Sequence, residues 1–242
     1  MRKVIPFCIL ISKTENMGLS ELKVQQSAQK LLVRRYEGKS WGKRIFSQLE
    51  VRTKQKYGGK RADGLLVFKH VFWGEFVVSM EAKSFKTLDA IRPYKDHGSI
   101  ILGSIKWGIY AVIGSGAGIA MIKQEDLFLK IGFPLIVFLL GAIIHLLLTQ
   151  NNVCHQMSNV IEQIRQYPGD HQWLAVSKDS LEKLTKAKKR SFKMTCKHRG
   201  IGIIVVNKRE KAKIWVRPRR NWNWFRSYLP YYSLEKRIRA SI

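Results

Sequence analysis

The feature that most constrains the fold is an apolar run at residues 131–148, which contains no Asp, Glu, Lys or Arg. A second apolar run, residues 99–122, contains one such residue, Lys106. Runs of this length allow a helix to cross the hydrocarbon core of a bilayer, where every backbone polar group must be satisfied within the helix. We therefore predict that residues 98–150 form a transmembrane helical hairpin embedded in the lipid bilayer, with spans at about 99–122 and 130–149.

Charged residues beside the first span predict the orientation of this hairpin. Arg92 and Lys95 precede the span, and positively charged flanks stay on the cytoplasmic side. We predict a multi-pass protein of a bacterial-type inner (cytoplasmic) membrane, with both termini in the cytoplasm. Gly114 and Gly118 have the spacing that lets helices approach closely. They either pack one span on the other or join two copies as a homo-oligomer, and the sequence leaves both open.

Ahead of the membrane hairpin, residues 61–84 contain two short β-rich runs separated by a polar link with a glycine. This pattern predicts a β-hairpin. Side chains two apart on a strand share a face, so Glu81 and Lys83 point the same way, and regular pairing places Asp63 opposite Glu81. Two carboxylates and an ammonium in one pocket suit phosphodiester cleavage. Mg²⁺ takes one or two carboxylate oxygens and keeps several waters, and a lysine beside it holds the phosphate.

These residues resemble the motif of the PD-(D/E)xK nuclease superfamily, which has the restriction-endonuclease-like fold. Asp63 matches the first acid of the motif, and Glu81, Ala82 and Lys83 match its (D/E)xK element. Ala62 stands where the family name has proline. The resemblance implies that Asp63, Glu81 and the carbonyl of Ala82 bind Mg²⁺ or Mn²⁺. It also implies that Lys83 is catalytic.

Two further acids are candidates for the same site. Apolar residues recur at helical spacing over residues 19–35, which predicts a helix, and residues 44–53 supply a first strand. In the superfamily a helix at this point often carries an additional acid, so the resemblance implies a catalytic role for Glu21. The alternative is that Glu21 is a surface residue of the first helical turn. Glu50, on the following strand, is the other acid candidate.

The chain after the membrane hairpin continues with a pattern that fits the same fold. A one-sided helix at residues 157–164 ends near Pro168, and strands are predicted at 171–177, 201–206 and 213–216. We predict an α/β restriction-endonuclease-like core, a mixed sheet flanked by helices, interrupted by the two-helix transmembrane hairpin between its third strand and second core helix. The predicted regions are 1–97 and 151–216 for the two halves of the nuclease-like domain, 98–150 for the membrane hairpin, and 217–242 for a basic aromatic tail.

The net charge of +27 at pH 7 and the isoelectric point near 10.3 indicate a polyanionic partner, either nucleic acid or an anionic membrane. Basic residues are dense at 183–199 and again at 217–226, where aromatic residues accompany them. This second mixture, continuing to Tyr231 and Tyr232, suits either stacking on unpaired bases or placement at the membrane interface. The candidate nucleic-acid-binding residues are Lys186, Lys188, Lys189, Arg190, Arg217, Arg219, Arg220, Trp222 and Trp224.

Together these patterns predict a membrane-anchored, metal-dependent nuclease that hydrolyses phosphodiester bonds of DNA. RNA is an alternative substrate, and defence against phage or other foreign DNA is the role that the predicted location favours. The alternative function is a non-catalytic membrane adaptor that binds nucleic acid or a cytoplasmic protein partner through its basic surface. No Walker, dinucleotide-binding, zinc-finger or serine-hydrolase motif occurs in the sequence, and its three cysteines are too scattered for a disulfide framework.

Overall fold

The computed structural model describes residues 19–119, 132–149, 155–221 and 227–242 of the chain. A six-stranded mixed sheet, in the order β1-β2-β3-β6-β7-β8, forms the centre of the molecule. Strands β1, β2 and β3 form an antiparallel meander, β3, β6 and β7 run parallel, and β8 pairs antiparallel with β7. The strands are β1 (Ser40–Arg52), β2 (Arg61–His70), β3 (Gly74–Lys83), β6 (His171–Ser177), β7 (Gly202–Val206) and β8 (Ala212–Val216).

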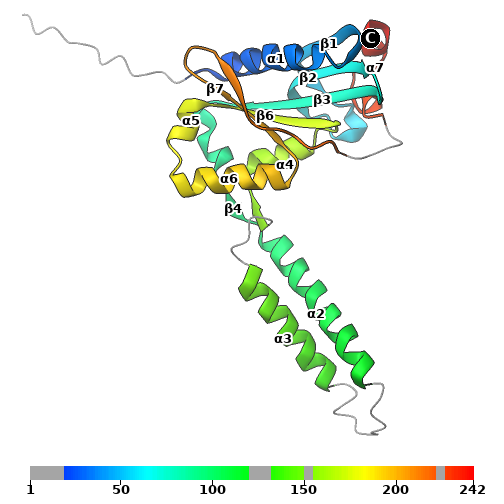
Figure 1. Cartoon of the computed structure of the whole chain (residues 1–242), viewed down its shortest axis with the longest axis vertical. Coiled ribbons are helices and arrows are strands. Elements are labelled where there is room, and N and C mark those ends of the chain that lie inside the picture. The colour runs from blue at the N-terminus through cyan, green and yellow to red at the C-terminus, as the bar shows by residue number, and fades with distance from the viewer. Residues whose placement is uncertain (1–18, 120–131, 150–154, 222–226) are drawn as a thin grey trace, which may run out of the picture.

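One face of the sheet is covered by helix α1 (Glu21–Glu37), as Figure 1 shows. The helix is amphipathic because Val24, Ala28 and Leu32 recur every four residues, and all three are fully buried. They pack on alternate residues of β2 and β3, which point to the same face of the sheet. The helix predicted at residues 19–35 is confirmed, with small shifts at both ends.

The opposite face of the sheet is covered by helices from later parts of the chain. Helices α4 (Asn159–Arg165), α5 (Lys178–Glu182) and α6 (Lys186–His198) pack over β6 and β7. The last part of the chain packs against β1, β2 and β3 through the 3₁₀ helix η5 (Leu229–Tyr231) and helix α7 (Glu235–Ser241). The molecule is therefore a mixed α/β fold in which a curled mixed sheet lies between two layers of helices.

Two apolar helices, α2 (His97–Ile119) and α3 (Phe133–Thr149), extend away from the sheet as a pair (Figure 1). They follow β3 and the 3₁₀ helix η2 (Phe85–Ile91) in the chain and precede α4. A two-stranded antiparallel ladder, β4 (Tyr94–Lys95) with β5 (Gln156–Met157), joins the pair to the rest of the molecule. We call that remainder, the six-stranded sheet with the helices packed on it, the sheet domain.

The two apolar helices contact each other at glycines. A Cβ added to Gly108 would lie 2.7 Å from the ring of Phe138, and one added to Gly141 would lie 2.8 Å from the Cβ of Ala111. Both positions therefore need the smallest residue for the helices to approach. A Cβ added to Gly114 would meet nothing within 4 Å. Among the described residues, Gly114 is therefore not a point of close approach between α2 and α3.

Within the described residues, one helical segment, His97–Ser115, is long and apolar enough to cross a membrane on length and composition alone. Helix α3 is apolar but has 17 residues, fewer than a full span. Large apolar side chains are exposed along both helices, for example Leu102 (62%) and Leu148 (78%). Residues 120–131, where we predicted the end of the first span and the start of the second, lie outside the described residues.

The sheet domain includes more of the chain than we predicted. Residues 227–242, which we placed in a basic tail, contribute to the core through η5 and α7. Tyr232 is fully buried, and its hydroxyl donates a hydrogen bond to the carbonyl oxygen of Pro168 at 2.6 Å. The interpretation of Tyr232 as a surface aromatic is therefore wrong. The β-hairpin predicted within residues 61–84 is confirmed, and so is the strand predicted at 171–177, whose bounds are identical.

Candidate active site

The β2–β3 hairpin brings Asp63, Glu81 and Lys83 together at one end of the sheet, so the geometry expected from the sequence is confirmed. The antiparallel register pairs Gly64 with Met80, and extending it by one residue places Asp63 opposite Glu81. Asp63 Oδ2 accepts a hydrogen bond from the backbone N–H of Ala82 at 2.8 Å. Lys83 Nζ donates to Glu81 Oε1 at 2.7 Å. We call these three residues, two acids and one lysine, the acidic triad site.

All three side chains of the acidic triad site are buried, although each is of a charged type. Their exposed fractions are 6% for Asp63, 1% for Glu81 and 8% for Lys83. Burial, followed by the charge of Asp63, raises the pKa of Glu81 to about 7, although Lys83 opposes this shift. Burial also raises the pKa of Asp63, opposed by the N–H of Ala82 and the charge of Lys83. Ionisation of the two carboxyl groups is thus disfavoured by burial even with Lys83 beside them.

One buried oxygen of the site has no hydrogen-bond partner among the described residues. Glu81 Oε1 is held by Lys83, whereas Glu81 Oε2 is buried and unbonded. Leaving a buried acceptor unbonded costs about 1–3 kcal/mol. A cation bound at Oε2 would remove this cost and would also offset the repulsion between the Glu81 and Asp63 carboxylates.

The donor set fits Mg²⁺ or Mn²⁺. Among the residues that the structure describes, no three His, Cys, Asp or Glu side chains gather closely enough to hold a metal by themselves. Mg²⁺ does not need such a cluster, because it binds through one or two carboxylates and keeps several waters. Asp63 and Glu81 supply two carboxylates at adjacent strand ends. The fit is therefore to a hard cation that retains water and not to a tetrahedral zinc site.

Of the two further acid candidates, the structure brings one to the site. Glu21 is the first residue of α1, and burial raises the pKa of its carboxyl group, which also interacts with the charges of Lys83 and Asp63. Glu50 is exposed on β1 and forms an ion pair with Arg61 at 3.7 Å. Glu21 therefore belongs to the surroundings of the acidic triad site, whereas Glu50 lies outside it.

Sequence analysis missed two glutamines of α1 that reach the same place. Gln25 lies one turn after Glu21, and its side chain interacts with the Asp63 carboxylate. Gln29 lies a further turn along, and a Cβ added to Gly64 would come within 2.5 Å of its Oε1. Gly64, the neighbour of Asp63, thus permits α1 to cross the strand here. The spacing of four residues is visible in the sequence as a polar helix face, but nothing in it reveals which strand that face meets.

A tyrosine from the opposite layer also faces the site. Burial raises the pKa of Tyr167 to about 12, with further contributions from the charges of Glu81 and Asp63 and from a hydrogen-bonding interaction of its hydroxyl with the Glu81 side chain. Gln163 donates a hydrogen bond to its hydroxyl at 3.1 Å. Tyr167 follows α4 in the chain, so the acidic triad site is bordered by residues from both halves of the sheet domain.

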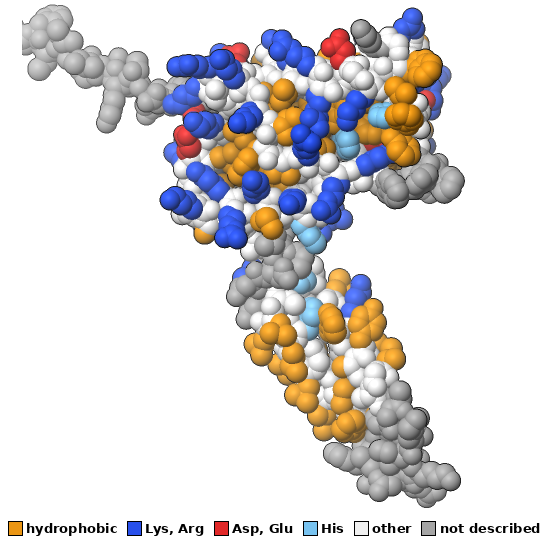
Figure 2. Space-filling model, viewed as in Figure 1, with side chains coloured by type: hydrophobic (Ala, Val, Ile, Leu, Met, Phe, Trp, Pro, Cys, Tyr) orange, Lys and Arg blue, Asp and Glu red, His pale blue; other side chains and the backbone are white. Residues whose placement is uncertain are grey.

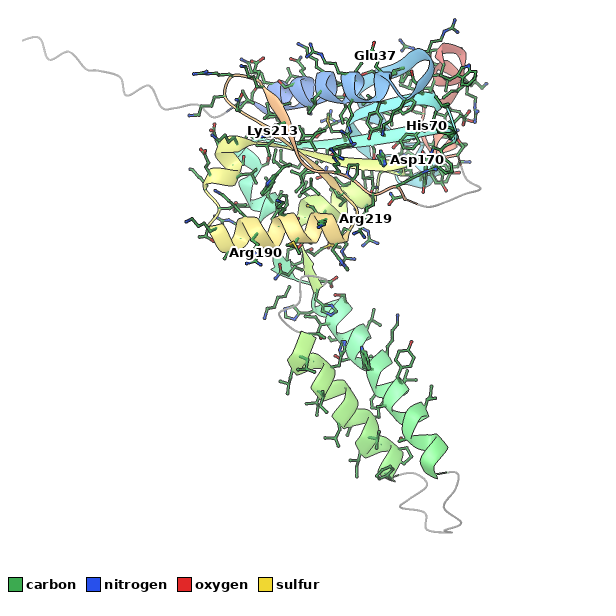
Figure 3. The ribbon with its side chains drawn as sticks, in the orientation of Figure 1. Glu37, His70, Asp170, Arg190, Lys213 and Arg219 are labelled. Atoms are coloured by element: carbon green, nitrogen blue, oxygen red, sulfur yellow. The ribbon has the colours of Figure 1, made fainter. Side chains whose placement is uncertain are left out.

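The candidate nucleic-acid-binding residues lie on other elements. Arg220 is held by Asp170, with 3.3 Å between its Nε and the carboxylate Oδ1. Figure 3 labels Arg190 and Arg219 on the side of the sheet domain that lies toward α2 and α3. The predictions for Trp222 and Trp224 lie outside the described residues. On α6 the candidates Lys186, Lys188 and Arg190 are exposed and Lys189 is half-buried, and after β8 Arg217 and Arg219 are exposed.

Comparison of the chain with protein-family models, with curated proteins and with solved structures found no match. The interpretation of the acidic triad site therefore depends on the geometry and electrostatics of its own residues.

Proposed function

We propose that this chain is a metal-dependent nuclease of the PD-(D/E)xK type that hydrolyses phosphodiester bonds of DNA. The observation that carries the proposal is the buried acidic triad site, in which Glu81 Oε2 has no hydrogen-bond partner among the described residues. The order of elements supports it: a helix precedes the sheet, the first acid lies on β2, and the (D/E)xK element ends β3. A mixed sheet with helices on both faces is compatible with a restriction-endonuclease-like core.

Asp63, Glu81 and the carbonyl of Ala82 are the groups that would hold Mg²⁺ or Mn²⁺. When bound, the ion polarises a phosphate oxygen and lowers the pKa of a coordinated water. The hydrogen bond from the Ala82 N–H fixes the orientation of the Asp63 carboxylate. Gln25 reaches the same carboxylate from α1, so two independent elements hold it in place.

Lys83 supplies the positive charge that phosphodiester cleavage needs beside these carboxylates. Its ammonium is buried, and electrostatic interactions are stronger there than in bulk water. Lys83 binds a non-bridging oxygen of the scissile phosphate and stabilises the negative charge that develops in the transition state. Glu21, which lies near Lys83 and Asp63, orients the attacking water.

The proposal includes an anchor in the inner membrane formed by α2 and α3, with both ends of the chain in the cytoplasm. The exposed apolar side chains of these helices support it, since large apolar surfaces are uncommon on water-exposed helices. The pair leaves the sheet domain after β3 and returns before α4, so it interrupts the proposed nuclease core. Defence against incoming foreign DNA is a role that suits an enzyme placed where such DNA enters the cell.

The experiment that tests this proposal is cleavage of linear, circular and single-stranded DNA by detergent-purified protein, with and without Mg²⁺ or Mn²⁺. Lys83→Met removes the ammonium but keeps the length of the side chain. We expect it to reduce the cleavage rate by about 10²–10³-fold, the effect of removing one group that stabilises transition-state charge. Lys69→Met, an exposed lysine at the other end of the same hairpin, is the matched control and is expected to cleave as the wild type does.

Two results would count against the nuclease. The first is metal-dependent cleavage that Lys83→Met leaves unchanged, which would place the activity elsewhere. The second is an absence of cleavage by all three proteins, with equal and salt-sensitive DNA binding, which would favour the non-catalytic adaptor. RNA of matched length, tested in the same assay, establishes which nucleic acid is the substrate.

A further inference from the structure

The surface of α6 is strongly basic on its exposed side. The helix contains no acidic residue, and its buried face consists of Phe192, Thr195 and Cys196. The basic residues on the remaining faces are Lys186, Lys188, Lys189, Arg190, Lys193 and Lys197. In Figure 2 Lys and Arg spread over the visible face of the sheet domain, whereas apolar side chains predominate on α2 and α3.

This basic helix lies beside the point where α2 and α3 join the sheet domain. In Figure 1 α6 lies along the side of the domain that is nearest to the two helices. Ser191 of α6 donates a hydrogen bond to the side-chain oxygen of Gln156, which belongs to β5 of the connecting ladder. Helix α6 thus contacts the ladder from which the apolar helices extend.

A groove lies between α6 and the connecting ladder. Its volume is about 380 Å³, and it is open to solvent. Lys95 from β4 and Lys188 from α6 are among the residues that line it. The remaining lining residues are Pro93, Tyr94, Gln156, Ala187 and Ser191. Two lysines, two polar side chains and an aromatic ring around one groove form a surface suited to a phosphate ester with an apolar attachment.

We propose that the outer face of α6 and this groove bind the phosphate groups of anionic phospholipids in the bilayer that α2 and α3 enter. The inference rests on the proposed membrane anchor and is independent of the proposed nuclease activity. Helices α2 and α3 fix which side of the sheet domain faces the bilayer, and α6 is on that side. Clusters of lysine and arginine directly beside a membrane span bind anionic headgroups, and the attraction acts within a Debye length of the surface.

The same position argues against DNA as the occupant of α6. A duplex bound there would share the space between the sheet domain and an anionic bilayer, which repels it. Arg190 and Arg219 are labelled in Figure 3 on the part of the sheet domain that lies toward α2 and α3. The inference therefore reassigns Lys186, Lys188 and Arg190 from nucleic acid to lipid.

The experiment uses the full chain in nanodiscs of neutral phosphatidylcholine or of phosphatidylcholine with phosphatidylglycerol, and measures hydrogen–deuterium exchange of the α6 amides. We expect exchange of α6 to slow by roughly tenfold in the anionic discs, because each cation near an anionic surface strengthens docking by about fivefold. The variant Lys186→Gln/Lys188→Gln/Arg190→Gln is expected to lose this difference. Glutamine keeps the helix propensity of lysine and arginine, so α6 itself is retained.

The matched control is Lys208→Gln/Arg209→Gln/Lys211→Gln, which removes the same number of positive charges from the β7–β8 turn. These residues are exposed, and the turn lies away from α2 and α3 in Figure 1. We expect this control to keep the lipid-dependent slowing of exchange in α6. Equal loss in both triple variants would overturn the inference, because it would show a non-specific effect of net charge.

Flotation with neutral vesicles separates the anchor from the docking surface. Wild type that floats, and whose α6 exchanges more slowly only in anionic discs, supports the inference. Wild type that floats but shows equal exchange in both discs overturns it and leaves the anchor intact. Failure to float overturns the anchor and the inference together, whereas the cleavage assay is unaffected. Protection of α6 by DNA in neutral discs, lost in the α6 variant, would assign the surface to nucleic acid.

Discussion

Two ion pairs with buried carboxylates lie toward opposite ends of β3, and they differ in how many hydrogen bonds each carboxylate accepts. At one end Glu81 is paired with Lys83 at 2.7 Å, and at the other Asp170 is paired with Arg220 at 3.3 Å. Both carboxyl groups are almost fully buried, and burial raises the pKa of each. Burial and pairing alone therefore do not distinguish a functional site from a structural one.

The hydrogen bonds distinguish the two pairs. Both oxygens of Asp170 are bonded, one to the backbone N–H of Val77 at 2.9 Å and the other to Arg220. Arg220 also lies 4.3 Å from the centroid of the Trp73 ring, where a cation–π contact holds it. Glu81 has one bonded oxygen and faces the like charge of Asp63. The unbonded oxygen of Glu81 and the second carboxylate beside it make Glu81, and not Asp170, the group suited to bind a cation.

Asp170→Ala is the change with the largest expected effect on stability. The change leaves the buried N–H of Val77 and the half-buried Arg220 without their shared partner, and we expect the free energy of unfolding to fall by about 3 kcal/mol. Chemical denaturation followed by tryptophan fluorescence measures it. Metal-dependent cleavage, assayed in conditions where the variant is folded, should be unchanged. Loss of cleavage by folded Asp170→Ala would remove the distinction between the two pairs.

Glu81→Gln tests the opposite end through the pH dependence of stability. The pKa of Glu81 is raised from 4.5 to about 7, so its contribution to stability is complete below pH 4.5 and is lost as the pH rises through 7. Glutamine does not titrate. Between these pH values we expect the free energy of unfolding of the variant to rise by about 3 kcal/mol relative to wild type. Denaturation at several pH values without divalent cations measures the difference, and parallel pH profiles would contradict the raised pKa.

Gly64→Ala perturbs the contact between α1 and the acidic triad site. The added Cβ would lie 2.5 Å from Gln29 Oε1 and 2.7 Å from Met80 Cε, so these side chains must move. Overpacking of this kind costs about 1–3 kcal/mol. We expect lower stability together with reduced cleavage, because Gly64 is adjacent to Asp63. Gly38→Ala, where the added Cβ meets nothing within 4 Å, is the control that should leave both quantities unchanged.

Glu21→Gln has the smallest expected effect of these changes. Residues that act beside a metal site without holding the metal alone typically change activity by about 10–100-fold, and we expect the lower end of this range. Glu50→Gln, which removes an exposed acid outside the site, should cleave at the wild-type rate. Equal cleavage by the two variants would show that Glu21 is a residue of the helix surface and takes no part in the reaction.

The sequence predicts the parts of this structure that depend on local periodicity. Alternation over β2 and β3 places Glu81 and Lys83 on one face, and a four-residue repeat of apolar residues gives α1. The pairing of Asp170 with Arg220 was not predictable, because it joins residues 50 positions apart whose contact depends on the path of the chain after β8. The burial of Tyr232 was missed for the same reason. The composition of residues 217–242 resembles that of a surface tail, and only tertiary packing places Tyr232 in the core.

Calorimetric titration of the full chain with Mn²⁺ near pH 6.5 tests directly whether the Glu81 carboxylate binds a divalent cation. Because the pKa of Glu81 is about 7, binding should release up to about one proton per ion, which appears as a dependence of the measured enthalpy on the buffer. We expect saturable binding with proton release in the wild type and in Arg220→Gln, and neither in Glu81→Gln. Binding that is identical in wild type and Glu81→Gln, or that releases no protons, would contradict the account.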